Sequence, residues 1–477
     1  MNAPNGQDRL FGRLLALAFA LTLAFGVLIA HYYDRLGSSP AQVATGTGTS
    51  GGDGTSGNQQ SPGDGAGGTA AATPGQNPTS VATSTTTKTG GTTTGKVPTG
   101  TTRGVSKGSI KVGGIFSITG PFDASPARDS TRAYFQLINS EGGVNGRTLE
   151  YISYDDAFDP TQGQNAARKL IEQDKVFAIV GWLAPNSEPA ASQYFAKVGL
   201  PVVGGLAVPQ EFGPRNFFAT MANLGKAGAA VARFPCDAKV KKPAVGIVDL
   251  PFADQMMAAV RKGLAQCGVT DPILTKIAST SADYTQYILE WRSKGADSIG
   301  AALDPMGFVK LMQALDRQSW HPPTWLVGSA DSERNAMVKN ALEGAFSVES
   351  QLVATLHTDL PGPRRYVETM HKYYPGTTIA STAQISWTAA QVFVEGLRRA
   401  GPDPTWQKVI EAIETLRDFK TDLTAPLTYT ATDHDAIKCI ELLQWKNGAW
   451  TDYYPDFQCW EYTSDGGTVV RPSRPFT

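Results

Sequence analysis

The sequence predicts a two-lobed α/β protein in which each lobe has a parallel sheet flanked by helices. Three observations predict this class. The chain has 477 residues, which is too long for one hydrophobic core of ordinary size. Short apolar runs typical of buried strands alternate with amphipathic, helix-like segments from residue 109 onward. The same alternation restarts at residue 243, and two such series indicate two sheets.

The N-terminal part, residues 1–36, contains an apolar segment that indicates whether the protein is exported from the cytoplasm. Leu14–Ala30 has no charged residue, and Arg9 and Arg13 precede it. The segment has no small-residue cleavage site of the A-x-A type at its end, and no Cys for lipid attachment follows it before Cys236. We therefore expect an uncleaved membrane anchor, with a cleaved signal peptide as the alternative; in both cases the rest of the chain is exported.

Residues 37–108 are predicted to be a disordered linker. Of residues 37–107, 48 are Gly, Ser, Thr or Pro, and none is Leu, Ile, Met, Phe, Tyr or Trp. Such a composition cannot bury enough apolar surface to offset the entropy of ordering the chain. Two Gly-rich nucleotide-binding motifs occur inside it, at Gly46–Gly51 and Gly90–Lys96, but neither follows a strand or begins a helix, so we expect no nucleotide to bind there.

The first α/β series follows the linker. Strands are expected at Ile110–Phe116, Leu149–Tyr154, Val176–Val180 and Leu200–Val203. Helices are expected at Asp129–Asn139, Thr161–Gln173 and Glu188–Lys197.

The second series supplies the strands and helices of the other sheet. Its strands are expected at Pro243–Val248, Ile273–Ile277, Ser298–Leu303 and Thr324–Val327, and its helices at Asp254–Cys267, Tyr284–Ser293 and Met306–Arg317. Further helices are expected at Arg364–Tyr374, Thr382–Arg399 and Trp406–Leu416, followed by strands at Leu427–Thr430 and Ile437–Gln444 and a hairpin turn at Asn447-Gly448.

Charge and motif content exclude several function classes. Lys and Arg total 42 and Asp and Glu 43, so no basic surface for nucleic acid is expected. The five His show no H-E-x-x-H spacing, and no Ser lies in a G-x-S-x-G turn. Asp155, Asp156 and Asp159 are interpreted as a strand end and a helix cap rather than as metal ligands. We therefore expect no enzyme, no metal site and no cofactor.

The four cysteines all lie in the exported part, where disulfides form. The predicted helices and strands favour the pairs Cys236–Cys267 and Cys439–Cys459. The two other pairings stay open, and so does a chain with four buried free thiols.

A series of motifs gives the sequence a family resemblance. They are Ile110–Ile115, Gly120-Pro121, Gly142–Arg147 (GGVNGR), Tyr154–Pro160 (YDDAFDP), Val176–Gly181, Gly199–Val203 and Ala425–Tyr429. With them, residues 109–460 resemble a type I periplasmic solute-binding protein of the branched-chain amino-acid (Leu/Ile/Val) family, whose members deliver solutes to ABC importers. The partners that this resemblance implies are a small-molecule ligand and an importer permease, beside the membrane through the N-terminal segment.

The resemblance implies three hinge crossings between the lobes, near Met221–Gly225, Gln351–Leu356 and Leu423–Ala425. Lobe one would comprise residues 109–222 and 355–423, and lobe two residues 223–352 and 424–465, with 466–477 as a tail. Ligand would close the hinge, because only the closed state contacts it from both lobes.

The resemblance also points to the loops that would bind the ligand. In the family, small hydroxyl residues of two lobe-one loops bind the amino and carboxylate groups of an amino acid. Here these loops are Gly181–Ser187 and Gly204–Pro209, and Pro185 and Val208 occupy the expected Ser and Thr positions. Since neither side chain can hydrogen-bond a zwitterion, we expect a more apolar ligand than a simple branched-chain amino acid. The candidate ligand-binding residues are Ser117, Phe122, Ser125, Trp182, Asn186, Leu206, Val208, Phe252, Asp304, Ser329 and Asp331. For Trp182 the alternative is core packing, and for Ser117, Ser125 and Asp331 it is helix capping.

Two other functions remain open from the sequence. The chain could be a ligand-sensing ectodomain that signals to a partner, or a hydrolase on a similar two-lobed scaffold.

Overall fold

The computed structural model describes residues 98–330, 335–338, 340–464 and 468–476. The predicted anchor, Leu14–Ala30, and most of the predicted linker lie outside these residues. No helix within the described ranges is long and apolar enough to cross a membrane.

In the described part of the chain, lobe one has a sheet of five strands in the order β2-β1-β3-β4-β5, all parallel. The strands are β1 (Ser109–Phe116), β2 (Thr148–Asp155), β3 (Ala178–Val180), β4 (Val202–Val203) and β5 (Phe217–Phe218). β1 lies between β2 and β3 and is buried along most of its length, which explains its continuous apolar sequence.

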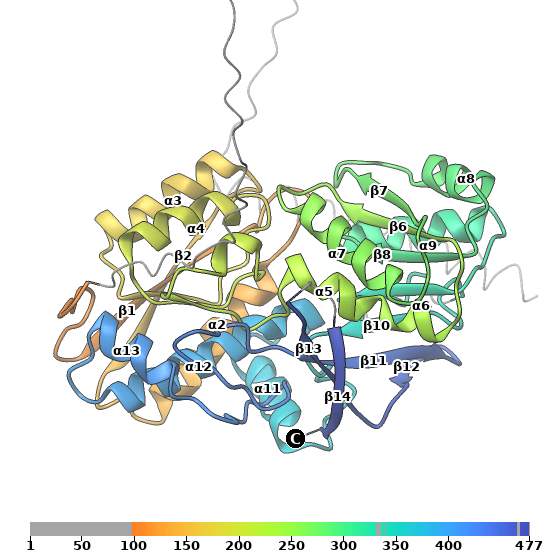
Figure 1. Cartoon of the computed structure of the whole chain (residues 1–477). Coiled ribbons are helices and arrows are strands. Elements are labelled where there is room, and N and C mark those ends of the chain that lie inside the picture. The colour runs from red at the N-terminus through yellow and green to blue at the C-terminus, as the bar shows by residue number, and fades with distance from the viewer. Residues whose placement is uncertain (1–97, 331–334, 339, 465–467, 477) are drawn as a thin grey trace, which may run out of the picture. The chain divides into compact units, whose positions relative to one another are not determined.

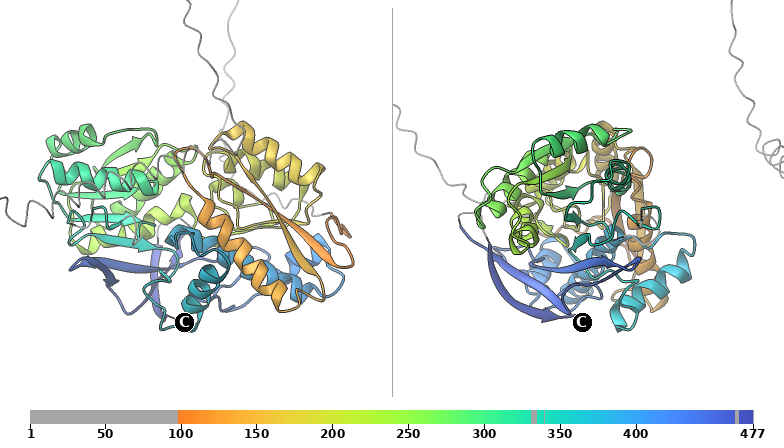
Figure 2. Two further views of the ribbon diagram at one scale, coloured as in Figure 1. Left: turned by 180° about the vertical axis from the view of Figure 1, so that it is seen from behind. Right: turned by 90° about the vertical axis from the view of Figure 1, so that its right-hand side faces the viewer.

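Helices cover both faces of this sheet, α3 and α4 on one side and α2 and α12 on the other (Figure 1). Figure 2 shows the same layering from behind. The elements are α2 (Ser125–Ser140), α3 (Pro160–Glu172), α4 (Glu188–Val198), η1 (Pro209–Glu211), α11 (Pro361–Tyr373), η2 (Ser381–Ala383), α12 (Gln384–Ala400) and α13 (Trp406–Ile413). α12 packs against α2 and α13, so this late part of the chain belongs to lobe one.

Over the described residues, the lobe-two sheet has nine strands. Its order is β14-β13-β11-β10-β9-β8-β6-β7, with β12 paired to β11. The strands from β6 to β10 are parallel, and those from β11 onward are antiparallel. They are β6 (Pro243–Val248), β7 (Ile273–Ile277), β8 (Ser298–Ala302), β9 (Thr324–Val327), β10 (Phe346–Glu349), β11 (Cys439–Lys446), β12 (Ala449–Asp452), β13 (Asp456–Tyr462) and β14 (Thr468–Pro475).

Alternate residues of β6 bury against different helices of lobe two. Val245 and Ile247 share a core cluster with residues of α7, whereas Ala244 shares one with residues of α8 and α9. The helices are α5 (Leu224–Val231), α6 (Arg233–Asp237), α7 (Ala253–Ala265), α8 (Thr285–Ser293) and α9 (Pro305–Arg317). α5 packs closely on α7 because Gly228 has no side chain: a Cβ there would lie 2.4 Å from the Val260 nitrogen.

The chain passes between the lobes three times, after β5, after β10 and after α13. Hydrogen bonds join the three crossings. Gln351 Nε2 donates to the Thr220 carbonyl at 3.1 Å, and the Leu352 amide donates to the Leu423 carbonyl at 2.7 Å. Tyr429 Oη donates to the Ala219 carbonyl at 2.7 Å. The three crossings are therefore joined to one another by hydrogen bonds.

The predicted strand Leu427–Thr430 is not formed: Leu427 and Thr430 make only isolated bridges, to Phe419 and Asp433. Two further stretches, at the ends of the folded part, are ordered where the sequence prediction has no element. The linker predicted to reach residue 108 is already packed on lobe one before that point, since Arg103 Nη1 donates to the Ile171 carbonyl at 3.1 Å and Val105 pairs with Ile110. Residues predicted only as a tail form β14, which pairs with β13 along its length. Backbone pairing to a neighbour, which a composition rule cannot detect, orders both stretches.

Two disulfides occur in the described chain, Cys236–Cys267 and Cys439–Cys459. They are the pairings that the sequence analysis favours. The first joins α6 to the segment after α7, and the second joins β11 to β13, where Cys439 and Cys459 are register partners. Both lie within lobe two, so neither restricts the three crossings.

Removing either disulfide should lower stability without preventing ligand binding. The bonds close segments with sequence separations of 31 and 20 residues, and loops of this size contribute about 2–4 kcal/mol, mainly by restricting the unfolded chain. Replacing Cys236 and Cys267 together by Ser should lower the free energy of unfolding by that amount in urea titrations. An unchanged denaturation midpoint would contradict the assignment.

Candidate functional site

An apolar cavity of about 130 Å³ lies between the two lobes. Lobe one contributes the side chains of Phe122, Leu183 and Leu206, and lobe two those of Phe252 and Leu303. Its lobe-two wall follows the carboxyl ends of parallel strands, the usual ligand position in open α/β sheets. Ligand pockets for drug-sized molecules measure roughly 300–1,000 Å³, so this cavity is smaller than a typical pocket of that kind.

Two larger cavities, of about 540 and 650 Å³, border β11, β13 and β14. Trp460 lines both of them. Neither cavity lies at the carboxyl ends of the parallel strands of both sheets, so neither would respond to closure of the lobes. We therefore take the cavity between the lobes as the candidate site.

The polar side chains of the cavity include two carboxyl groups and no cation. Asp304 and Glu349 line it, and among its described lining residues none is Arg, Lys or His. Asp304 also caps α9, because its Oδ1 accepts from the Met306 and Gly307 amides at 3.1 and 2.8 Å. Burial raises the pKa of this carboxyl above its usual value.

Glu349 is buried at the end of β10 and holds the loop that follows β9. Its Oε1 accepts from the Ser329 and Ala330 amides, both at 2.9 Å, and from Ser347 Oγ at 2.6 Å. Burial raises the pKa of Glu349 to about 7 although these donors lower it. The site thus favours apolar groups and hydrogen-bond donors over an anion placed directly beside these acids.

Glu188 lies behind the lobe-one wall of the cavity and hydrogen-bonds the loops that form this wall. This side chain is fully buried at the start of α4. One carboxyl oxygen accepts from the Leu206 amide and the other from the Ala184 amide at 3.3 Å. Glu188 therefore joins the loop after β3 to the loop after β4, and these two loops place Pro185 and Leu206 in the cavity wall.

A second buried acid, Glu211, forms a hydrogen bond with Glu188. Its Oε1 also accepts a hydrogen bond from Ser192 Oγ at 3.2 Å. Burial raises the pKa of both carboxyls, that of Glu188 to about 7, and the charge of Glu188 raises the pKa of Glu211 further. Two buried carboxylates in contact repel each other when both are charged, which favours the protonated form of at least one of them.

Trp182 lies in the core and does not line the cavity. Its side chain is fully buried and packs edge-on against Phe195, with ring centroids 5.3 Å apart. The indole approaches Gly205 so closely that a Cβ there would lie 2.6 Å from Nε1. The direction of this ring depends on the conformation of the loop after β3, which the sequence pattern does not determine.

The other sequence-predicted site residues fall into three groups. Phe122, Leu206, Phe252 and Asp304 line the cavity. Ser117, Ser125, Asn186, Val208 and Ser329 are not among its lining residues, and Asp331 lies outside the described residues. Val208 is buried in a cluster with Leu224 and Phe252 directly behind the wall, and Asn186 Nδ2 donates to the Phe158 carbonyl at 2.8 Å.

Sequence reasoning missed Glu188, Glu349 and Gln351. Each is a polar side chain in or beside an apolar segment, a pattern that an exposed residue also produces. The only available signal was the position of Glu188 directly after the Gly181–Ser187 loop.

The pH dependence of stability should report on Glu188. Its pKa in the folded chain lies above the value of about 4.3 in the unfolded chain, so its contribution to stability is present below that pH and is lost as the pH rises through about 7. Glu188→Gln should remove on the order of 2 kcal/mol from the difference in unfolding free energy between pH 4.5 and pH 8. Glu368→Gln, an exposed control on α11, should leave this difference unchanged. Equal pH dependence in all three proteins would contradict the role of the pair.

Comparisons with known proteins agree with this architecture. A family model described as periplasmic binding protein matches residues 109–449, more than half of the chain. A Leu/Ile/Val-binding protein homolog from Brucella suis is 23% identical over 368 residues, which cover 73% of this chain and 92% of the relative.

Two solved structures share the fold. A branched-chain amino acid ABC transporter protein from Thermus thermophilus with bound valine has a TM-score of 0.65 at 18% identity, covering 73% of this chain and 96% of its own. A solute-binding protein from R. palustris in complex with benzoate has a TM-score of 0.63 at 19% identity. The match covers 77% of this chain and 98% of the R. palustris chain. On the extent of the family match, the chain belongs to the periplasmic binding protein family.

Proposed function

We propose that the protein is an extracytoplasmic solute-binding protein that closes its lobes around a small, largely apolar molecule and presents it to an ABC importer. The observation that carries this proposal is the cavity shared by both lobes, whose walls are mainly aliphatic and aromatic. Removing such surfaces from water on closure supplies the free energy that would favour the closed state when ligand is present.

The relatives support a transport role and leave the ligand class open. The name of the Brucella suis relative refers to leucine, isoleucine and valine, whereas the solved neighbours include proteins with valine and with benzoate. In the present chain Pro185 has no backbone N–H to donate, and Val208 offers no hydroxyl. The described lining residues also include no cationic side chain that could bind the carboxylate of an amino acid. Both observations argue against a free amino acid as the ligand.

Leucine, isoleucine and valine are therefore expected to bind weakly or not at all. Isothermal titration calorimetry should compare these three with benzoate and with a short-chain aliphatic alcohol and amine. Native mass spectrometry of the purified protein would identify a ligand retained from the cell. Low-micromolar or tighter binding of leucine would overturn the proposed ligand class, and chemical conversion of a bound molecule would favour the hydrolase alternative.

Truncating the aromatic wall should weaken the best ligand of this series. Phe252→Ala and Phe122→Ala should each cost about 1–3 kcal/mol of binding free energy if the ring packs against the ligand. Phe419→Ala removes a partly buried ring that does not line the cavity and serves as the control. Unchanged affinity in both wall variants would place the ligand elsewhere.

We also propose that Leu14–Ala30 tethers the protein to the membrane. The apolar length of the segment and the two arginines before it support an anchor, and the disulfides fit an oxidising compartment outside the cytoplasm. Fractionation of the native cells should find the protein with the membranes and with its N-terminal peptide intact. A soluble form that begins near His31 would instead show a cleaved signal peptide.

A further inference from the structure

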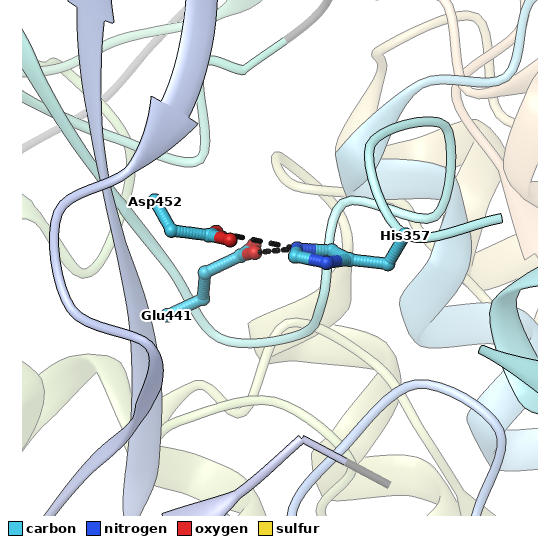
Figure 3. A group of neighbouring side chains, drawn as sticks. All are labelled: His357, Glu441 and Asp452. Carbon is cyan, nitrogen blue, oxygen red and sulfur yellow. Dashed lines mark hydrogen bonds and ion pairs between the residues drawn. The ribbon is translucent and has the colours of Figure 1, made fainter. Parts of the chain in front are cut away.

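His357, Glu441 and Asp452 form a cluster outside the cavity, and we propose that it binds a divalent transition-metal ion of the zinc type. Figure 3 shows the two carboxyl groups meeting the imidazole from one side. His357 Nε2 contacts Glu441 Oε1 and lies 3.4 Å from Asp452 Oδ1. One ligand atom from each residue lies within 4.8 Å of the other two.

The fold brings these residues together from distant parts of the sequence. His357 follows the second crossing, 84 residues before Glu441. Glu441 lies on β11 and Asp452 ends β12, where it pairs with Leu443. Since alternate residues of a strand share a face, Glu441 and Asp452 lie diagonally on the same face of this hairpin. Short-range motif spacing therefore gives no sign of the site.

The donor set suits zinc better than calcium or magnesium. Zinc in proteins is bound by His nitrogen and carboxylate oxygen at about 2.0–2.2 Å, and sites with three protein ligands leave a fourth position for water. Ligand atoms of a tetrahedral centre are then about 3.3–3.5 Å apart, close to the separation of His357 Nε2 and Asp452 Oδ1. The contact between His357 Nε2 and Glu441 Oε1 is shorter, so the ion would replace this hydrogen bond and move the two groups apart. Calcium takes six to eight oxygen ligands and would not favour an imidazole.

The surroundings of the cluster support a metal site in two further ways. Glu441 Oε2 accepts from the Val353 amide at 2.9 Å, which fixes the carboxylate in the manner of an outer-shell partner. The Asp452 side chain is 37% exposed, whereas those of His357 and Glu441 are 7% and 0% exposed, so an ion could enter along one side. Metal binding deprotonates its ligands, so a neutral His357 with two carboxylates would then carry two negative charges, which one divalent cation would balance.

A bound ion would attach the second crossing to the β11–β12 hairpin. His357 lies six residues after Gln351, which contacts the first crossing and lines the cavity. The ion would therefore stiffen the hinge on its lobe-two side. This inference does not depend on the ligand of the cavity.

Zinc titration of the full, chelator-treated protein tests the proposal. Calorimetry with ZnCl₂ should show one site, and Co²⁺ in place of Zn²⁺ should give visible d–d absorption. His357→Ala and Asp452→Asn should each weaken the affinity at least tenfold. His371→Ala, on the last turn of α11, should not. Because Asp452 is partly exposed, Asp452→Asn should keep the fold, which circular dichroism verifies.

Two results would overturn the proposal. The first is the absence of zinc binding up to ~100 µM, which would identify the cluster as a buried ion pair only. The second is zinc binding that persists in both His357→Ala and Asp452→Asn, which would place the ion elsewhere.

Discussion

The hydrogen bonds of Gln351 and Leu352 hold the three crossings together, and the position of the cavity depends on them. The Gln351 side chain donates to Thr220 of the first crossing and accepts from Thr388 of α12 at 3.2 Å, while the neighbouring Leu352 amide reaches Leu423 of the third crossing. These groups are buried, so breaking one bond leaves an unpaired polar atom at a cost of about 1–3 kcal/mol. A closing motion of the lobes would therefore turn about these crossings.

The walls on either side of this hinge are held by buried acids. In lobe one Glu188 ties together the two loops that follow β3 and β4, and in lobe two Glu349 holds the loop after β9. Each carboxyl accepts hydrogen bonds from backbone N–H groups that would otherwise be unpaired in a region shielded from water. Aliphatic and aromatic side chains thus face the cavity, while the polar groups behind them fix the loops.

Much of the fold could be predicted because buried parallel strands have continuous apolar sequences between turn residues. The predicted strands Pro243–Val248, Ile273–Ile277 and Thr324–Val327 have the observed bounds. β10 was missed because Ser347 and Glu349 interrupt its apolar pattern, and both are buried there to bind the β9 loop. The site was harder to predict, since a position after a strand does not determine where a side chain points: Phe252 faces the cavity, whereas Trp182 turns into the core.

Hydrogen–deuterium exchange, measured by mass spectrometry with and without the ligand retained from the cell, tests most directly whether the ligand binds between the lobes. We expect the ligand to slow exchange both in peptides covering residues 204–211 of lobe one and in peptides covering residues 302–307 of lobe two, because both segments contribute to the cavity wall. Slower exchange should also extend to the crossing around Gln351. Protection confined to one lobe, or to the peptides of β13 and β14, would contradict binding by closure of the two lobes.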